Sequence, residues 1–283
     1  IINPWDLAYV SEKYKKENYG VSQEELKQYF PVENVIKGLF KLVKSLYGIE
    51  VKIKKTKSVW HPDVRLYEIF DKNKNLRGKF YFDLYARPNK RGGAWMDECI
   101  QRRLKSNGSV QAPVAFITCN SSPATKASPA FFTHYDVETL FHEFGHGLQH
   151  MLTKVDYAGI SGISGVEWDA VELPSQFMEN WCWEKDVLDT FAFHFETNQK
   201  LPNKLFKKLL ATKNYNSGMA LLRQIEFSLF DFLLHMNEEK KKTKLTETVL
   251  QSVRKETSLL AVHKNNKFQN SFAHIFSGGY AAG

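Results

Sequence analysis

The sequence is poor in cysteine and has no long apolar run. Its three cysteines (Cys99, Cys119 and Cys182) are odd in number, lie far apart and form no Cys-x-x-Cys pair. This spacing excludes a disulfide scaffold and predicts a reducing compartment, the cytoplasm. No apolar stretch approaches the roughly 18 residues of a membrane span, so we expect no membrane partner.

Arginine is also scarce, and this bears on nucleic acid as a partner. The net charge of +8 comes almost wholly from lysine, with 31 Lys against 8 Arg. Base readout favours Arg, and a nucleic-acid footprint gathers its charge on one face. Here the lysines are scattered, with runs only at 52–57 and 240–244, which is typical of solvated faces. We therefore expect no nucleic-acid partner, although charge alone keeps that alternative open.

Apolar periodicity predicts strands first and helices after them. Two strands, 66–70 and 80–84, flank a polar turn and predict a hairpin. The segment 114–119 is a further strand, either an edge strand that could pair with a peptide or a core strand. Helical patterns follow at 136–153, 167–185, 203–212, 217–237 and 245–260, after an earlier helix that stops at Gly48. This order predicts an α+β fold with a small sheet under a helical layer.

One motif, His-Glu-Phe-Gly-His at residues 142–146, points to metal chemistry. In a helix, His142 and His146 lie on the same face, so both imidazoles can bind one ion. Glu143 follows the first histidine, within reach of a metal-bound water. Asp136 is the expected N-cap of this helix. The alternative is a helix with two ordinary core or surface histidines.

A catalytic zinc ion needs a third protein ligand and keeps its fourth position for water. His150 is spaced for the same helix face but lies about 12 Å from His142 along the axis. Two ligands that are each about 2 Å from one ion cannot span that distance. We expect His150 to be a polar residue at the rim of the site.

Acidic residues after the motif offer better third ligands. Glu167, Glu172 and Glu179 are all possible from spacing alone. Asp169 lies three residues before Glu172 and could orient a ligand histidine from behind. The alternative for each acidic residue is a solvated charge on an amphipathic helix.

Longer motifs make the sequence resemble the M3 family of zinc metallopeptidases, and within it the branch of bacterial oligopeptidases. The resemblance runs in order along nearly the whole chain. It is carried by Phe-His-Glu-Phe-Gly-His-Gly at 141–147, by segments 161–166 and 168–181, and by shorter matches at 4–6, 59–64, 80–94 and 273–280.

This resemblance implies the roles of the motif residues. His142, His146 and Glu172 correspond to the ligands of one zinc ion per chain, and Glu143 corresponds to the general base. The implied fold is a predominantly helical, zincin-like metallopeptidase domain with a small β-sheet, a single catalytic domain over 1–283.

The resemblance also implies substrate-site residues near the end of the chain, His274 and Tyr280. Family members carry further tyrosines beyond this point and a helical region before the start. We therefore expect a fragment that is incomplete at both ends. Losing one oxyanion donor typically costs about 10²–10³ in rate, so the isolated chain is expected to cleave poorly.

The activity implied is that of a monomeric, cytoplasmic oligopeptidase, a zinc-dependent endopeptidase that hydrolyses short unfolded peptides. Two alternatives stay open. A dipeptidyl carboxypeptidase of the same family differs only in the substrate end that it recognises. A zinc-stabilised, non-catalytic fragment would need the ligands but no base beside them.

Overall fold

The computed structural model describes residues 3–236, 245–272 and 274–277. These residues form two compact units, each described by itself. Unit 1 comprises Ile1–Val21 and Lys208–Gly283, and unit 2 comprises Ser22–Lys207. The single catalytic domain stays a prediction. None of the described helices combines the length and the apolar character needed to cross a lipid bilayer.

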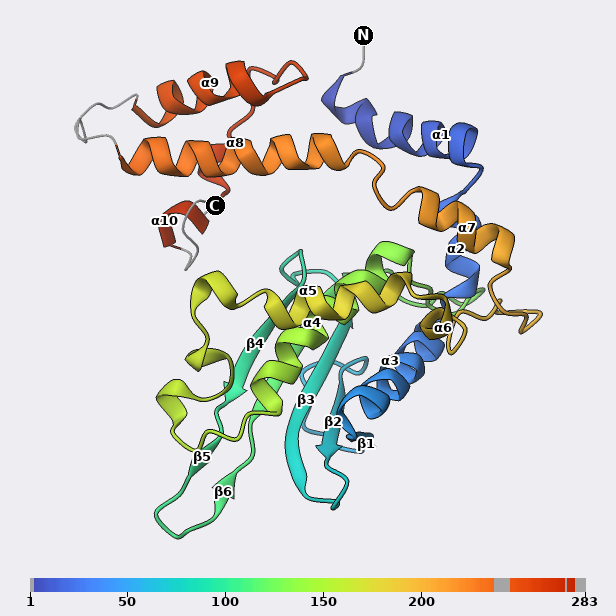
Figure 1. Ribbon diagram of the computed structural model, residues 1–283, viewed down its shortest axis with the longest axis vertical. Coiled ribbons are helices and arrows are strands. Elements are labelled where there is room, and N and C mark those ends of the chain that lie inside the picture. Colours follow the sequence, from blue (N-terminus) through green and yellow to red (C-terminus); the bar gives the residue numbers. More distant parts are fainter. Residues whose placement is uncertain (1–2, 237–244, 273, 278–283) are drawn as a thin grey trace. The chain divides into compact units, whose positions relative to one another are not determined.

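A five-stranded mixed sheet organises unit 2 (Figure 1). In spatial order its strands are β1 (Glu50–Lys54), β2 (Arg65–Phe70), β3 (Leu76–Tyr85), β7 (Val114–Ser121) and β4 (Trp95–Ile100). Only the β3–β7 pair is parallel. The predicted hairpin is confirmed as β2 and β3. A separate two-stranded ribbon consists of β5 (Arg103–Leu104) and β6 (Val110–Gln111).

Strand β7 lies inside the sheet, between β3 and β4. Its residues Ala115, Ile117 and Cys119 are buried. Of the two sequence-based alternatives for 114–119, the edge strand is therefore wrong and the core strand is right. The edge next to β7 is formed by β4, whose last four residues are exposed, and β1 forms the opposite edge.

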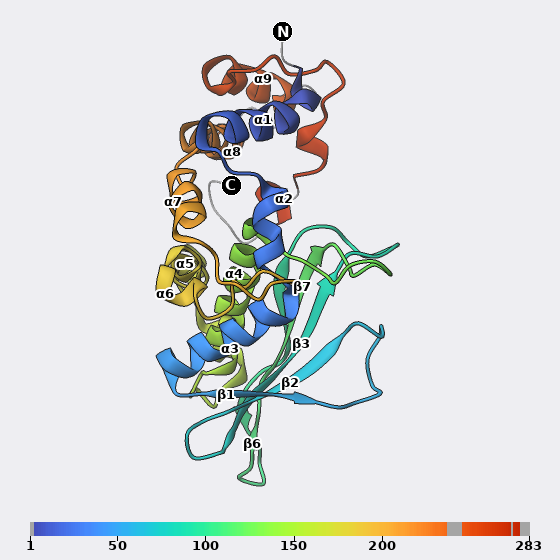
Figure 2. The same ribbon diagram turned by 90° about the vertical axis from the view of Figure 1, so that its right-hand side faces the viewer.

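Two long helices cover one face of the sheet, α3 (Val32–Tyr47) and α4 (His134–Met151), as Figure 2 shows. Phe40 of α3 and Phe144 of α4 both pack against Phe80 and Phe82 of β3. Alternation along β3 points these two rings towards the helices. The predicted stop at Gly48 is confirmed, because this residue ends α3 with a left-handed φ of 66°.

The start of α4 differs from the expected N-cap. Thr133 caps the helix, and its hydroxyl accepts a hydrogen bond from the Asp136 N–H at 3.1 Å. The Asp136 carboxylate in turn accepts the Thr133 N–H at 2.8 Å. This is a reciprocal capping box, so Asp136 stabilises the helix start from its third position rather than as the N-cap.

The predicted helix 167–185 is broken into shorter pieces. A 3₁₀ turn at Trp168–Ala170 is followed by α5 (Leu173–Asn180), a second 3₁₀ turn at Trp181–Trp183 and α6 (Lys185–Leu188). The unit also contains the short helix α2 (Gln23–Leu26), and α7 (Asn203–Ala211) crosses the boundary with unit 1. Pro174 fits within the first turn of α5, where its missing N–H costs nothing. The break therefore places Glu172 at the N-cap of α5.

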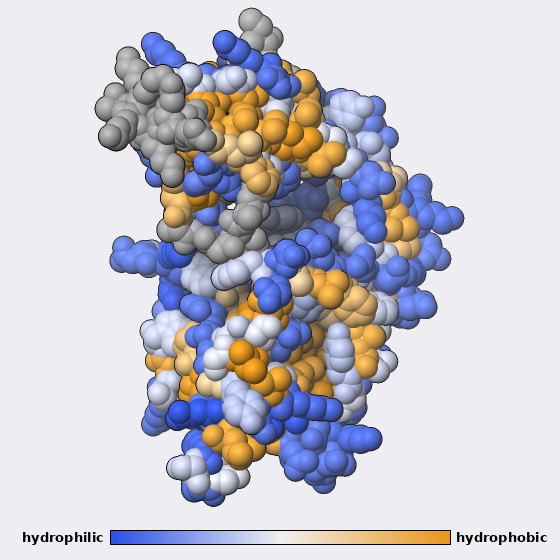
Figure 3. Space-filling model, turned by 60° about the vertical axis from the view of Figure 1, so that its left-hand side comes forward, coloured by the Kyte–Doolittle hydropathy of each residue, from blue (hydrophilic) through white to orange (hydrophobic). Residues whose placement is uncertain are grey.

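Unit 1 is helical, with α1 (Leu7–Tyr19), α8 (Ser217–His235), α9 (Leu245–Thr257) and α10 (His274–Ser277). Its core contains Phe230, Leu250 and Ile275. Arg254, buried on α9, donates to Glu226 on α8 at 2.9 Å. Exposed apolar side chains also gather on this unit, in the upper part of Figure 3.

A buried ion cluster joins the inner strands of unit 2. The Asp83 carboxylate accepts hydrogen bonds from Arg87 at 2.6 and 2.8 Å, Lys90 at 2.9 Å and Trp60 at 2.8 Å. Lys90 also donates to the carbonyl of Cys119, which links β3 to β7. Burial alone would raise the pKa of Asp83, but these hydrogen bonds lower it to about 2.

We expect Asp83→Asn to lower the free energy of unfolding at pH 7 by about 3 kcal/mol, because Lys90 loses its buried countercharge. The pKa is lower in the folded chain, so the unfolded chain binds the extra proton between about pH 2 and 4. The contribution of Asp83 is thus complete above pH 4 and lost as the pH falls through 2. Urea unfolding at a series of pH values from 2 to 7 measures both effects.

The matched control is Glu50→Gln, which removes a carboxylate from an exposed pair of lysines. It should leave the free energy of unfolding nearly unchanged. Equal losses in the two variants would contradict the role assigned to Asp83.

Candidate active site

Helix α4 places three side chains that can bind a metal ion or take up a proton in one region of unit 2, namely His142, Glu143 and His146. His142 and His146 are one turn apart and lie on the same face. Glu143 is buried, and His142 is partly exposed. The neighbouring rings of Phe141 and Phe144 are fully buried, so the opposite side of the helix is anchored in the core.

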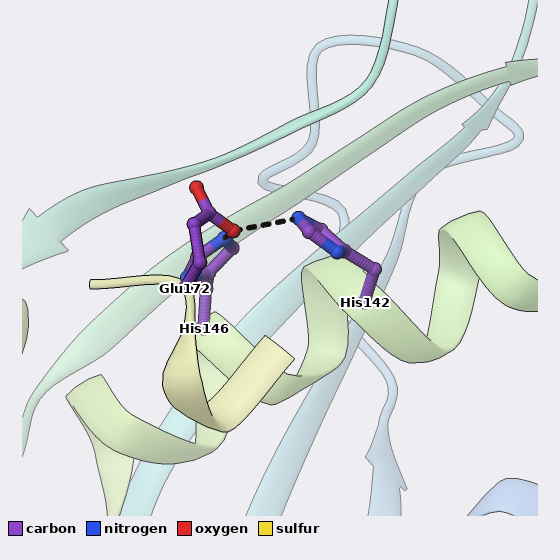
Figure 4. Close-up of side chains that lie close together, drawn as sticks. All are labelled: His142, His146 and Glu172. Carbon is purple, nitrogen blue, oxygen red and sulfur yellow. Dashed lines mark ion pairs between the residues drawn. The ribbon is translucent and has the colours of Figure 1, made fainter. Parts of the chain in front are cut away.

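Glu172, at the start of α5, completes a cluster with the two histidines (Figure 4). Its Oε2 atom lies 3.2 Å from the Nε2 of His142 and 3.2 Å from the Nε2 of His146. The three candidate ligand atoms all lie within 4.8 Å of one another. Among the described residues this is the one group of three or more His, Cys, Asp or Glu side chains close enough to hold an ion.

The cluster depends on a close approach of the two helix backbones. A Cβ atom on Gly145 would lie 2.5 Å from the carbonyl oxygen of Pro174 and 2.6 Å from the Cα of Ser175. Only glycine permits this contact. The Ser175 hydroxyl also donates to Glu172 Oε2 at 2.8 Å, which fixes the carboxylate towards the histidines.

A second carboxylate supports His142 from behind. Its Nδ1 donates to Glu179 Oε1 at 2.6 Å. Burial alone would lower the pKa of His142, but hydrogen bonds to Glu172 and Glu179 outweigh it and raise the pKa to about 9. Asp169 is exposed, and within the described chain no hydrogen bond or ion pair joins it to a histidine. Glu179 makes the contact that we expected of Asp169.

The three glutamates that spacing left open are thus separated. The Glu172 carboxylate lies beside the Nε2 atoms of both ligand histidines. Glu179 contacts the Nδ1 atom of His142, and Glu167 is exposed. Glu172 and Glu179 are seven residues apart, close to two helical turns, so they share a face of α5. That spacing was the available signal for Glu179.

Glu143 lies between the metal cluster and the edge strand. Its carboxylate accepts a hydrogen bond from the backbone N–H of Met96 on β4. Burial raises the pKa of Glu143 and Glu172 adds to this, although the two histidines oppose it. A cavity of about 380 Å³ opens over Glu143 and His142. Sequence reasoning missed its further lining residues, which are Ala94, Tyr135, Glu138 and Thr139.

His150 is outside the metal cluster, in agreement with the distance argument. The expectation of a polar rim position is wrong, because His150 is completely buried. Its Nε2 donates to the carbonyl oxygen of Ile100 at 3.0 Å.

The two residues expected from the end of the chain belong to the part of the sequence that forms unit 1. His274 lies in unit 1, on α10, where it is exposed and its ring stacks on Phe272 with a centroid separation of 5.3 Å. Tyr280 lies outside the described residues. Substrate contacts by either residue stay predictions.

The donor set fits a zinc ion. Bonds of about 2.0–2.2 Å to nitrogen and oxygen in tetrahedral geometry separate the ligand atoms by about 3.4 Å. The 3.2 Å distances from Glu172 to both imidazoles are close to this value. A carboxylate behind a ligand histidine, as Glu179 lies behind His142, is also typical of zinc sites.

Two imidazoles, one carboxylate and a buried glutamate beside the first histidine define the class of metallopeptidases. Comparison with known proteins gives the family. Residues 1–283 match the sequence profile of peptidase family M3, and the chain belongs to this family.

The relatives are longer than this chain. It is 53% identical to oligopeptidase A of Escherichia coli and 49% identical to oligopeptidase A of Haemophilus influenzae. These alignments cover 100% and 99% of the chain but 42% and 41% of the relatives. Dipeptidyl carboxypeptidase of E. coli is 34% identical over 99% of the chain and 41% of its own length.

We expect Gly145→Ala to weaken zinc binding at least about tenfold, because the methyl group pushes α5 and Glu172 away from α4. The control is Gly147→Ala on the same helix, whose Cβ would meet only the side-chain ends of Ile117 and Met151, at 3.0 and 3.3 Å. Competition with a chromogenic chelator measures both affinities. Unchanged zinc affinity in Gly145→Ala would show that the helix contact does not position Glu172.

Proposed function

We propose that this chain carries the catalytic centre of a zinc-dependent endopeptidase that hydrolyses short unfolded peptides. One zinc ion per chain would be held by His142, His146 and Glu172. The observation that carries the proposal is the position of Glu172, whose Oε2 is 3.2 Å from both imidazoles in a chain of the M3 family.

Zinc, when bound, lowers the pKa of a coordinated water and polarises the scissile carbonyl. Glu143 then acts as the general base that takes the proton of the attacking water and returns it to the leaving amine. Its buried position supports this role, because burial raises the pKa of the carboxyl towards the neutral range in which a base is most effective.

The supporting residues keep the ligands in one orientation. Glu179 accepts the Nδ1–H of His142, which fixes the tautomer and leaves Nε2 free for the metal. Ser175 holds Glu172 in the same way through its hydroxyl. By resemblance, His274 and Tyr280 are proposed to contact the substrate or the developing oxyanion.

The edge strand β4 is the proposed binding surface for the peptide backbone. Its outer side is unpaired within the sheet, and its last four residues are exposed. An extended peptide can add to such an edge as a further strand. Because Met96 of β4 contacts Glu143, a peptide along this edge would pass beside the base.

Three wider features belong to the same proposal. A zincin-like fold is supported by a helix that carries both histidines beside the edge of a mixed sheet. A cytoplasmic location is supported by the three free cysteines. We also propose that the protein acts as a monomer.

We expect Glu143→Gln to keep about one zinc per chain and to lose about 10²–10⁴-fold in peptide cleavage, because it removes the base but no ligand. Glu172→Gln should lose zinc as well as activity. Exposed Glu167 provides the control, since Glu167→Gln should change neither. Elemental analysis and a quenched fluorescent peptide give the two readings.

Each outcome of this test separates the alternatives. Zinc in both the unmutated chain and Glu143→Gln with cleavage in neither would favour the zinc-stabilised, non-catalytic fragment. Absence of zinc from the unmutated chain would refute the proposal altogether.

A dipeptidyl carboxypeptidase is the second candidate, favoured by the 34% identity to the E. coli enzyme of that name. The two activities differ in their need for a free carboxyl terminus. We expect peptides with an amidated C-terminus to be cleaved as fast as free peptides and at internal bonds. Mass spectrometry of the products measures this. Removal of two residues at a time, and only from peptides with a free C-terminus, would favour the dipeptidyl carboxypeptidase.

A further inference from the structure

A further histidine on α4, His150, performs no role in the proposed chemistry and yet is completely buried. His150 lies one turn beyond His146, and its Nε2 donates to the carbonyl of Ile100 at 3.0 Å. Ile100 is the last residue of β4. The contact therefore ties the metal helix to the far end of the edge strand.

Together with Glu143, this histidine fixes β4 at two points. Glu143 accepts the N–H of Met96 near the start of the strand, and His150 donates to Ile100 at its end. The two helix positions are about 10 Å apart along the axis, and the two strand positions are about 13 Å apart. The edge strand therefore runs alongside the helix over nearly its whole length.

His150 also supports the loop that follows α4. Gly162 has a left-handed φ of 63°, and a Cβ on it would lie 2.6 Å from the Nδ1 of His150. This nitrogen has no hydrogen-bond partner among the described residues. The imidazole is therefore enclosed between the end of β4 and the glycine of the loop.

The same loop is bonded directly to the edge strand. The Ser164 hydroxyl donates to the Glu98 carboxylate at 2.8 Å. Gln101, just after β4, donates to the Ser164 oxygen at 2.8 Å and to Glu98 at 3.0 Å. Loop and strand thus form one assembly that rests on His150.

An open polar pocket of about 330 Å³ lies beside this assembly, at the far end of β4. Its walls include Glu98, Arg103 and Gln111, with Ala158 from the loop. The cavity is separate in its lining from the one that opens over Glu143. Ile100 is four positions along the strand from Met96, so the cavity lies up to about four peptide residues from the base.

We propose that His150 is a positioning residue, which holds the end of β4 and the loop 158–165 so that they form a distant polar subsite for extended peptides. The inference rests on the proposed peptidase function. The substrates that bind more tightly because of this subsite are peptides long enough to pair with β4 from Met96 to Ile100. Shorter peptides, which pair only near Met96, do not reach the subsite.

Three substitutions test the role of the Nε2–H donor. His150→Leu removes it and leaves the Ile100 carbonyl without a partner. His150→Gln places an amide N–H near the position of Nε2 and should restore the contact. Gly162→Ala keeps the histidine but displaces the loop through the clash with Nδ1.

Peptide affinity is measured in a Glu143→Gln background, so that nothing is cleaved, with a long and a short fluorescent peptide. We expect His150→Leu and Gly162→Ala to raise the Kd of the long peptide about tenfold and to leave the short one unchanged. The His150→Gln variant should bind both peptides with the same Kd as the chain that retains His150. Zinc content should stay at one per chain throughout.

Hydrogen exchange provides the structural reading. Amides of residues 95–101 and of 158–165 should exchange faster in His150→Leu and at the original rate in His150→Gln. Equal loss of affinity for both peptides, or unchanged exchange in these two segments, would overturn the inference. Failure of the proposed function would show instead in the zinc content and the cleavage activity of the unmutated chain.

Discussion

The candidate site depends on one close contact, the approach of α4 to the start of α5 at Gly145. The metal ligands come from two helices, and nothing within α4 alone can supply the third. A Cβ on Gly145 would lie 2.5 Å from the Pro174 carbonyl, so any larger residue separates the helices. At glycine's distance, Glu172 Oε2 meets both imidazoles at once. The absence of a Cβ atom at residue 145 therefore allows the three donor side chains to bind one ion.

Electrostatics follow from that contact. The carboxylates of Glu172 and Glu179 form hydrogen bonds with His142, and these raise the pKa of His142 to about 9 against the effect of burial. The same arrangement attracts a divalent cation, because the ion takes the place of protons on the same donors. Glu143 lies deeper, where burial dominates and raises its pKa. Two neighbouring glutamates, Glu172 and Glu143, therefore suit different roles, a charged ligand and a proton acceptor.

Local signals predicted the parts of the site that lie within one helix. His142, Glu143 and His146 follow from helical periodicity, and Glu172 from the family resemblance. Asp169 was expected to orient a ligand histidine and Glu179 was left open as a third ligand, because both expectations assumed a continuous helix over 167–185. The chain instead breaks at the 3₁₀ turns, which turns Asp169 to solvent and brings Glu179 behind His142. Such breaks depend on packing against α4, and the periodicity of apolar residues carries no information about that packing.

The order of the strands in the sheet could not be predicted from the sequence pattern either. The apolar segment 114–119 suits either an edge or a core, and only the route of the chain decides. From β3 the chain passes to the outermost strand, β4, and returns through a ribbon to fill the gap as β7. The apolar strand therefore carries α4 on its inner side, while the polar strand with Asp97 and Glu98 becomes the exposed edge. Because Glu143 and His150 bind that edge from the same helix, the route of the chain also determines where a peptide can approach the base.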